Sequence, residues 1–315
     1  MIPTFKNLLD ASAYFHNEEV CREHLERIRW NGNPVCPYCA SASRPYRLKD
    51  GKTFRCSDKD CRADFSVRVG TIFENSKLPL RKWFLAIHLA TAHKKGISSL
   101  QLHRDLGITQ KTAWFVLHRI REMLTDASPE LLTGPVQIDE SYFGPDFKNL
   151  HKSKRAKIKS KPGRGASLKT MVFGIINDGT VHNQVVADTK NTTLLPIMVD
   201  KVAKGSTIVT DGYHIYKRLA ADYNHITVDH AKDEYVTKEG FHTNSIEGYW
   251  SQLKRGIYGI YHQVSPKHLH RYCDEFAYRY NTRKKTDSER FNLSIEKASG
   301  KRLRYKHLIQ KNVSK

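Results

Sequence analysis

The sequence predicts a multidomain chain of the α+β and α/β classes, in which two small N-terminal modules precede a larger domain built on a mixed sheet. Three observations predict it: four cysteines within residues 36–61, helical periodicity over 79–125, and a strand-rich pattern from residue 131 onward. A length of 315 residues is enough for two domains or more. The expected division is a helical segment at 1–33, a cysteine ribbon at 34–70, a helical domain at 71–128, the mixed-sheet domain at 132–285 and a basic C-terminal tail at 286–315.

Composition and charge narrow the classes of function. Hydrophobic residues make up 39% of the chain, which is enough for a packed core and excludes wholesale disorder. No apolar run reaches the roughly 18 residues of a membrane span, and residues 1–15 lack the pattern of an export signal, so we expect a cytoplasmic protein. The 53 Lys and Arg residues exceed the 32 Asp and Glu residues by 21. This excess favours nucleic acid as the partner, with ribosomal RNA or an acidic lipid surface as alternatives.

The cysteine pattern predicts a metal site in the ribbon. Cys36 and Cys39 form one short pair, and Cys56 and Cys61 form a second pair sixteen residues later. Two such knuckles match the tetrahedral four-sulfur site that zinc prefers, and the intervening RPYRLKDGKTFRC alternates like a β-hairpin with a turn at Lys-Asp-Gly. Two disulfides are the alternative. The other two thiols, Cys21 and Cys273, are expected to be buried without a metal.

Residues 79–125 predict helices that are arranged to bind DNA. A first helix starts at Pro79, a second spans about Ser98–Leu106, and a third runs from Thr109, as its N-cap, to about Leu124. A short glycine turn between two helices is typical of the helix-turn-helix motif, whose second helix enters the major groove. The residues expected to face bases are Gln110, Lys111 and Thr112, and those expected to face phosphate or solvent are His118, Arg119 and Arg121.

From residue 131 the chain alternates strands and helices. We expect strands in PVQIDESYFG, LKTMVFGIIND, TVHNQVVAD, STIVTD and NHITVDH, with a hairpin turn at residues 178–180. Helices are expected at about 192–203, 213–221, from 243 onward and at 266–282. Three consecutive strands followed by alternating helices and strands is the element order of the ribonuclease H-like fold. In that fold the sheet is mixed and its first and fourth strands are neighbours.

A basic stretch follows the first of these strands. Residues 148–169 hold nine Lys and Arg residues and no acidic residue, which predicts a flexible loop. Because the loop leaves the strand directly after acidic residues, we favour contact with DNA phosphates over a merely solvated surface. The expected contacts are Lys152, Lys154, Arg155, Lys157, Lys159, Lys161 and Arg164.

Acidic residues at strand ends predict a second metal site. Asp139 lies in the first strand of the mixed-sheet domain and alternates with Ile138, and Asp211 closes the fourth strand. Two carboxylates that share a site repel each other and favour divalent cations, and two Mg²⁺ ions held in this way activate phosphodiester chemistry. Glu247 and Asn244 share one face near the start of the helix that begins near 243, with Lys254 two turns after Glu247 and Arg255 beside it as DNA contacts. An ordinary cap followed by a surface Glu/Lys pair is the alternative.

Taken together, the motifs resemble a known family. They are CPYC…CSDKDC, QIDESYFG, VTDGYHIY, HTNSIEGYWSQLKRGIYGIYH and FAYRYNTRK, which span most of residues 34–285. In this order they resemble bacterial insertion-sequence transposases of the DDE class, in the ISXO-like branch with an N-terminal zinc ribbon. The resemblance implies a protein that binds terminal inverted repeats, nicks the transposon ends by hydrolysis and joins the freed 3′-OH to target DNA.

The resemblance also implies roles for particular residues. Asp139 and Asp211 match the family's two aspartates, and the third position is asparagine in part of the family and glutamate in another part. Both residue types are present here, and we favour Glu247 as the ligand, with Asn244 as co-ligand. We therefore expect two Mg²⁺ or Mn²⁺ ions as cofactors and double-stranded DNA as the partner. We also expect a homodimer or higher oligomer on DNA, and association with the bacterial nucleoid.

Two other classes of function stay open at this level. One is a zinc-ribbon and helix-turn-helix transcriptional regulator whose C-terminal domain is inactive; a pure DNA binder has no use for three convergent carboxylates, which speaks against it. The other is a structure-selective nuclease that cuts but does not join. The N-terminal DNA-reading modules favour a transposase over such a nuclease.

Overall fold

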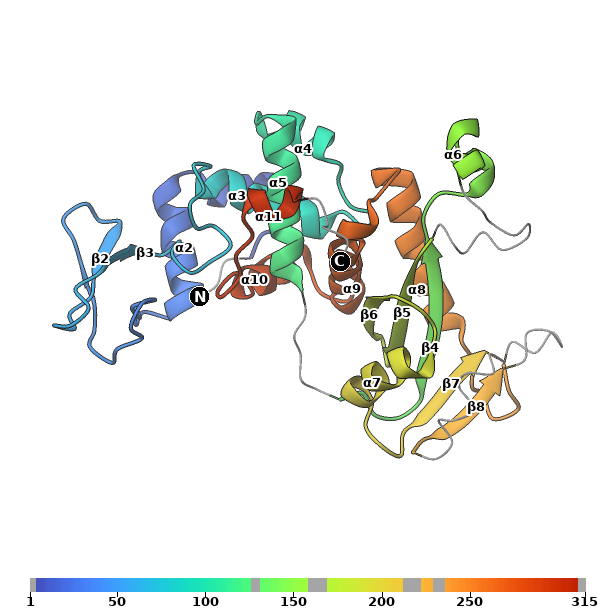
Figure 1. The fold of residues 1–315 in the computed structure, drawn as a ribbon. Helices are drawn as coiled ribbons and strands as arrows, with labels where there is room; N and C mark the ends of the chain where they lie inside the picture. The colour runs from blue at the N-terminus through green and yellow to red at the C-terminus, as the bar shows by residue number, and fades with distance from the viewer. Residues whose placement is uncertain (1–3, 126–130, 158–168, 212–221, 229–235, 311–315) are drawn as a thin grey trace. The chain divides into compact units, whose positions relative to one another are not determined.

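The computed structural model describes residues 4–125, 131–157, 169–211, 222–228 and 236–310. The chain divides into two compact units (Figure 1). Unit 1 comprises residues 1–125 and 282–315, and Unit 2 comprises residues 126–281. Unit 2 is therefore inserted between two parts of Unit 1.

Unit 1 combines a small sheet with helices. In chain order its elements are α1 (Leu8–Tyr14), α2 (Glu18–Trp30), β1 (Tyr46–Arg47), β2 (Thr53–Arg55), β3 (Asp64–Ser66), α3 (Leu80–Ala92), α4 (Ser99–Leu106), α5 (Gln110–Leu124), α10 (Asp287–Glu296) and α11 (Tyr305–Ile309). The expected hairpin is present as β1–β2, and β3 adds a third antiparallel strand that was not expected. Phe54 and Phe65, opposite each other on β2 and β3, pack against Trp30 of α2, so the ribbon rests on that helix.

The C-terminal residues complete the core of Unit 1. The ring of Phe291 on α10 lies 5.4–5.5 Å, between centroids, from the rings of Phe5, Phe15 and Phe84. The segment 286–315, expected to be a basic tail, therefore includes a helix of the core, α10. The high charge of this segment conceals apolar residues at core spacing, which the N-terminal helices bury.

The helices of residues 98–124 follow the prediction. Ser98 and Thr109 accept hydrogen bonds from the backbone N–H groups of Gln101 and Thr112, so both serve as N-caps. Between them Gly107 ends α4 with φ of +57°, a left-handed conformation that suits glycine. A short glycine turn thus joins α4 to α5.

Unit 2 contains one five-stranded mixed sheet. Its elements are β4 (Val136–Phe143), a 3₁₀ turn (Phe147–Asn149), α6 (Lys152–Lys157), β5 (Thr170–Asn177), β6 (Thr180–Val186), α7 (Asn191–Lys201), β7 (Thr207–Asp211), β8 (Asn224–Val228), α8 (Asn244–Gly256), a π-helical turn (Ile257–Tyr261) and α9 (Pro266–Asn281). The strand order is β6-β5-β4-β7-β8. The β4–β5–β6 pairs are antiparallel and the β4–β7–β8 pairs are parallel, which confirms the mixed sheet. The helix expected at 213–221 lies outside the described residues.

Helices cover both faces of this sheet (Figure 1). Ile138, Phe173 and Ile208 pack on one face with Leu194 and Met198 of α7. On the other face the apolar side of α8 packs with α9 and with side chains of β5. A Cβ at Gly256 would come within 1.9 Å of the Phe276 ring, so a glycine lets α8 and α9 approach closely. Alternate residues of β4 therefore face different layers.

The basic stretch that follows β4 is not wholly a loop. It includes the end of the 3₁₀ turn and the short helix α6, while residues 158–168 lie outside the description. Alanine and lysine favour helix, which explains how KSKRAK forms a turn and a half despite its charge. In the part of the chain whose structure is described, no helix has the length and apolarity to cross a membrane.

Candidate active site and metal centre

Asp139 lies at the centre of the sheet, with its side chain toward α8. Ile138 is buried in the layer that contains α7, so the alternation of the strand turns Asp139 to the opposite face, as predicted. There its Oδ2 accepts a hydrogen bond from the Trp250 indole N–H (3.0 Å). Its Oδ1 accepts one from the backbone N–H of Glu140 (2.7 Å). Both carboxylate oxygens are thereby held in place.

Trp250 reaches Asp139 because a glycine lies beneath its ring. Gly174 on β5 is paired with Asp139 across the sheet. A Cβ at Gly174 would lie 2.5 and 2.7 Å from Cζ2 and Cη2 of Trp250. The indole therefore occupies the space that any larger residue would fill. Neither Gly174 nor Trp250 was predicted as a site residue, although a glycine inside an apolar strand is a signal of such close approach.

Strand pairing puts the two aspartates at the same level of the sheet. The parallel β4–β7 ladder pairs Val136 with Ile208 and Gln137 with Val209. Asp139 and Asp211 each follow the second of these pairs by two residues. In adjacent parallel strands this register puts the two residues opposite each other and on the same face. The predicted adjacency of the first and fourth strands is therefore confirmed.

The start of α8 is fixed to β4 by a glutamine. The side-chain Oε1 of Gln137 accepts hydrogen bonds from the backbone N–H groups of Ser245 and Ile246, each at 3.1 Å. Gln137 thus supplies, from another element, the acceptor that an N-cap side chain normally provides, since Thr243 makes no such bond. One turn into α8, Glu247 accepts a hydrogen bond from the Thr243 hydroxyl (3.2 Å). No sequence motif predicted this role for Gln137.

Asp139, Asp211 and Glu247 are here called the carboxylate cluster, because Asp139 senses the charges of the other two. The pKa of Asp139 is raised to about 6, mainly by burial, and the negative charges of Asp211 and Glu247 contribute to this rise. The hydrogen bonds from Glu140 and Trp250 act in the opposite direction. Carboxylate oxygens from three elements are the hard ligands that Mg²⁺ and Mn²⁺ prefer. Asn244, the alternative ligand, is the exposed first residue of α8.

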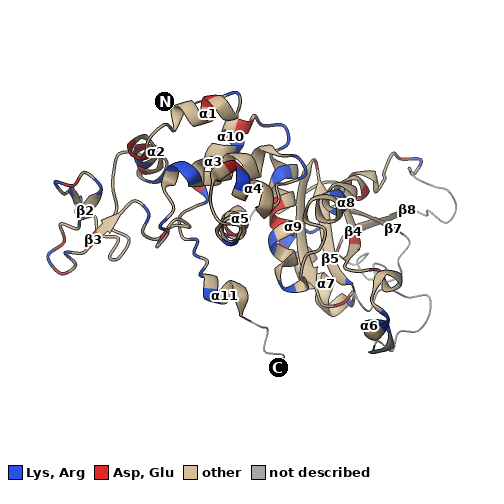
Figure 2. Cartoon of the chain, turned by 90° about the horizontal axis from the view of Figure 1, so that it is seen from above, with Lys and Arg blue, Asp and Glu red and all other residues tan. Residues whose placement is uncertain are grey.

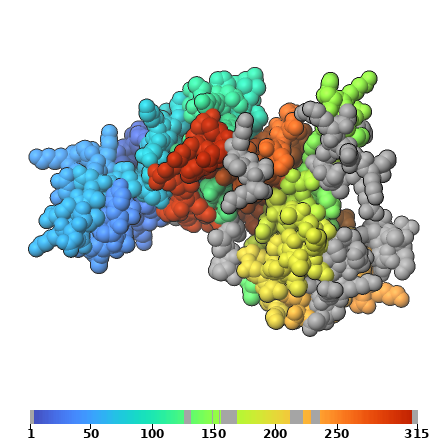
Figure 3. All heavy atoms as spheres, in the orientation of Figure 1, coloured from blue at the N-terminus to red at the C-terminus, as the bar shows by residue number. Residues whose placement is uncertain are grey.

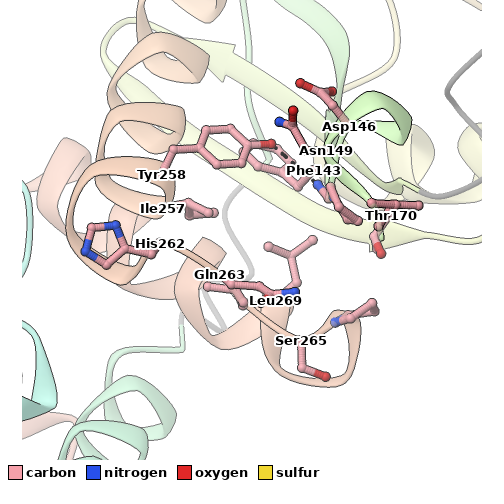
Figure 4. Close-up of a pocket in the computed structure, with 15 residues that line it drawn as sticks. Phe143, Asp146, Asn149, Thr170, Ile257, Tyr258, His262, Gln263, Ser265 and Leu269 are labelled. Atoms are coloured by element: carbon pink, nitrogen blue, oxygen red, sulfur yellow. Dashed lines mark hydrogen bonds between the residues drawn. The ribbon is translucent and has the colours of Figure 1, made fainter. Parts of the chain in front are cut away.

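A row of exposed side chains continues along α8 from Glu247. Ser251, Lys254 and Arg255 are exposed, and Tyr258 follows in the π-helical turn, at the spacing of one helix face. This row ends at a cavity of about 950 Å³, which lies between the end of β4, the residues after it and the start of α9. In Figure 4 Tyr258 extends across this cavity, where its hydroxyl accepts a hydrogen bond from the Gly144 N–H (3.4 Å). Asn149, His262 and Gln263 add polar groups to the lining.

The four predicted cysteines converge in the ribbon. Their Sγ atoms all lie within 4.8 Å of one another. The Cys36–Cys61 and Cys39–Cys56 Sγ separations are 3.8 and 3.5 Å. Four sulfurs at 2.3 Å from a tetrahedral zinc are about 3.8 Å apart, so the arrangement fits a structural zinc ion. Within the ranges described above, the three carboxylates do not form a group of this tightness.

The base-facing residues predicted on α5 differ in their surroundings. Gln110 and Lys111 are exposed in its first turn, and Thr112 is half-buried. The Gln110 amide donates to the Ser99 hydroxyl (2.9 Å). The Lys111 ammonium lies 5.1 Å from the centroid of the Tyr305 ring. The accessible part of α5 is thus its N-terminal turn.

The prediction that Arg119 faces phosphate or solvent is wrong. Arg119 is 4% exposed, donates to the Glu74 carbonyl (2.9 Å) and lies 5.1 Å from the centroid of Trp83. Burial lowers its pKa to about 10. His118 and Arg121 are buried too. This part of α5 packs against α3, and the buried side chains of His118, Arg119 and Arg121 are not exposed for contact with DNA.

The basic residues after β4 are described in part. Lys152 and Arg155 are exposed on α6, whose ribbon is largely blue in Figure 2. Arg155 also donates to the Leu150 carbonyl (2.6 Å). The side chains of Lys154 and Lys157 are not described, and Lys159, Lys161 and Arg164 lie outside the described residues.

Comparison with known proteins gives a consistent result. Residues 131–281 match the ISXO2-like transposase domain, and residues 16–64 match the transposase zinc-ribbon domain, which includes α2 as well as the cysteines. An uncharacterized protein in the transposable element ISH50 of Halobacterium salinarum is 31% identical over 294 residues, which cover 90% of this chain and 98% of that protein. An uncharacterized transposase-like protein of Haemophilus influenzae is 26% identical over 102 residues, which cover 32% of this chain and 80% of that protein. The chain belongs to the ISXO2-like family of insertion-sequence transposases, with an N-terminal zinc ribbon.

Proposed function

We propose that this chain binds the terminal inverted repeats of its insertion sequence and catalyses metal-dependent DNA cleavage and strand transfer. The observation that carries the proposal is the register between β4 and β7. Gln137 pairs with Val209, and Asp139 and Asp211 each lie two residues after that pair, so they occupy equivalent positions on the two strands. The electrostatic effect of Glu247 on Asp139 supports a third member from α8. The strand order β6-β5-β4-β7-β8 supports a ribonuclease H-like catalytic unit.

In this proposal Asp139, Asp211 and Glu247 hold two Mg²⁺ or Mn²⁺ ions. The ions, when bound, activate the attacking oxygen and stabilise the leaving oxygen of the phosphodiester. Trp250 and the Glu140 N–H orient the Asp139 carboxylate, and the Thr243 hydroxyl orients that of Glu247. Prior orientation of the ligands lowers the entropy cost of assembling the site.

The residues of α8 beyond Glu247 guide the DNA strand. Lys254 follows Glu247 by seven residues, about 10 Å along the helix axis. Its ammonium and the Arg255 guanidinium bind backbone phosphates and hold the scissile bond near the carboxylates. The α4–α5 pair serves as the helix-turn-helix that reads the repeats through Gln110, Lys111 and Thr112. The exposed cations of α6 add contacts that do not depend on sequence.

The test is cleavage and joining of a duplex that carries the element's terminal repeat, with Mg²⁺ present. We expect Asp139→Ala and Asp211→Ala to reduce both steps by roughly a thousandfold, about 4 kcal/mol, because they lose a metal ligand. Repeat binding should stay within about twofold of wild type, since recognition lies in Unit 1. Glu239→Gln, which changes an exposed acidic residue of Unit 2, is the matched control and should be fully active.

Further variants assign the remaining roles. Glu247→Gln and Asn244→Ala identify the third ligand, which is the residue whose loss removes Mg²⁺-dependent cleavage while the fold is kept. Lys254→Ala should have a smaller effect than either aspartate variant, because it positions DNA without holding metal. Normal cleavage by both aspartate variants would refute the catalytic assignment and favour the regulator. Cleavage without joining by the wild type would favour the nuclease.

A further inference from the structure

A short C-terminal segment of Unit 1 lies against α5. In Figure 3 these residues, in red, cover part of the teal and green helices of Unit 1. The Tyr305 ring meets the Phe115 ring edge-on, with centroids 5.4 Å apart. It also lies under the Lys111 ammonium, 5.1 Å from its centroid. The segment therefore contacts the helix that is proposed to read DNA.

Two further contacts fix this segment in place. The Gly300 N–H donates to the Gly70 carbonyl (2.9 Å), and Arg302 pairs with Glu74 (2.8 Å). Leu303 and Leu308 are buried on either side of Tyr305. These anchors define one path for residues 300–308, which we call the C-terminal arm.

The arm presents positive charge on its outer side. Residues 301–307 have the sequence KRLRYKH, with four Lys and Arg residues and no acidic residue. Buried and exposed positions alternate, so that Arg304, Lys306 and His307 are exposed between the anchors. Arg304 directly precedes α11, and Lys306 lies in its first turn. A cationic strip beside a DNA-reading helix is suited to bind the phosphates that flank the site.

Only the first turn of α5 has exposed side chains, so α5 alone offers few contacts to DNA. Past its first turn, the described side chains of α5 are buried or half-buried. A recognition helix that offers one turn to the groove needs other elements to fix its register on the duplex. The arm lies next to that turn and touches it through Lys111.

We propose that the C-terminal arm is part of the DNA interface: Arg304 and Lys306 bind phosphates of the duplex beside the site, and Tyr305 orients Lys111 toward the groove. This inference rests on the proposed binding of terminal repeats by α4 and α5. It adds the C-terminal arm to that interface as an element besides α4 and α5.

The test measures the affinity of the full-length chain for duplex DNA by fluorescence anisotropy at several salt concentrations, with a terminal-repeat probe and a scrambled probe. In the double variant Arg304→Gln/Lys306→Gln, the plot of log affinity against log salt should become less steep by about two, because two phosphate contacts are lost. It should weaken binding to both probes alike. Lys284→Gln/Lys285→Gln, which removes two exposed lysines of the same unit, is the matched control and should leave the slope unchanged.

Tyr305→Ala separates the second part of the proposal. It should reduce the ratio of affinities for the repeat and the scrambled probe several-fold, since Lys111 loses its support. The Arg304/Lys306 variant changes only exposed side chains, so it remains informative even where Tyr305→Ala loosens the arm. An unchanged slope in that variant, or an equal decrease in the lysine control, would overturn the arm's role. Failure of the wild type to prefer the repeat would instead overturn the proposed function.

Discussion

The cysteine cluster and the carboxylate cluster bring their ligand atoms together in different ways. The four cysteine sulfurs lie within 4.8 Å of one another, and the cysteines of the two knuckles are at most 25 positions apart in the sequence. The carboxylates come from two strands and a helix, and Asp139 and Glu247 are 108 positions apart. Each cysteine knuckle is local, whereas Asp139, Asp211 and Glu247 are brought near one another only by the sheet and α8. The sulfur geometry fits a closed structural zinc site, whereas the proposed function requires carboxylates that stay accessible to a substrate.

Loss of a sulfur ligand should give the largest effect in this comparison. In Cys39→Ser the protein should lose its zinc, about one ion per chain, and the ribbon should unfold, because structural zinc sites contribute on the order of 10 kcal/mol to folding. Metal analysis and calorimetry measure the two effects, and the transition of Unit 2 should persist. Cys21→Ala, which alters a buried thiol outside the cluster, should retain the zinc. Stoichiometric zinc in Cys39→Ser would mean that the four-sulfur assignment is wrong.

A change beneath the carboxylate cluster should have an intermediate effect. Gly174→Ala forces the Trp250 ring away from Asp139, and we expect a loss of about 2 kcal/mol in the free energy of unfolding, together with slower Mg²⁺-dependent cleavage. Urea denaturation and cleavage rates provide the measurements. The control is Gly248→Ala on α8, where a Cβ meets nothing within 4 Å. That variant should gain about 1 kcal/mol from helix propensity. Equal behaviour of the two variants would show that Trp250 does not position Asp139.

Removal of a carboxylate should have the smallest effect on stability. Whereas loss of a cysteine destabilises the ribbon, loss of a carboxylate should leave the metal-free protein as stable as before or more stable. Without divalent metal, Asp211→Asn should be at least as stable as wild type, because it relieves repulsion of Asp139. Mg²⁺ at about ten times its Kd should stabilise the wild type by about 1.4 kcal/mol, a rise of a few degrees in Tm, and the variant should lack this rise. Asp200→Asn, on the exposed face of α7, should retain it. If the metal-free Asp211→Asn protein lost folded structure, as is expected for the ribbon of Cys39→Ser, the two clusters would not differ in their effect on stability.

The sequence predicted those features of the fold that are encoded locally. The strands that carry Asp139 and Asp211 follow from apolar alternation, and the N-cap Thr109 follows from side-chain chemistry. The convergence of Cys36, Cys39, Cys56 and Cys61 follows from their spacing. In each case the necessary information lies within a few residues of the feature.

Contacts between distant elements account for what was missed. Gln137 acts on backbone groups more than 100 positions away, and Trp250 depends on the gap above Gly174, so neither role has a local pattern. Arg119 was misassigned because its partners, Glu74 and Trp83, lie on other segments. The segment that contains Phe291 resembles a tail in the sequence because its charge outweighs its apolar residues.

The position of Phe291 has a consequence for synthesis of the chain. A ribosome delivers residues 1–125 first, yet the aromatic core of Unit 1 needs a ring that is translated only after all of Unit 2. Unit 2 is contiguous, so all of its residues are available before α10 of Unit 1 is synthesised, and we expect the N-terminal core to close only after that. A product cut short by a premature stop codon within Unit 2 therefore lacks both a closed N-terminal core and the arm beside α5. We expect such a fragment to be degraded, because the apolar side chains that Phe291 covers would stay exposed.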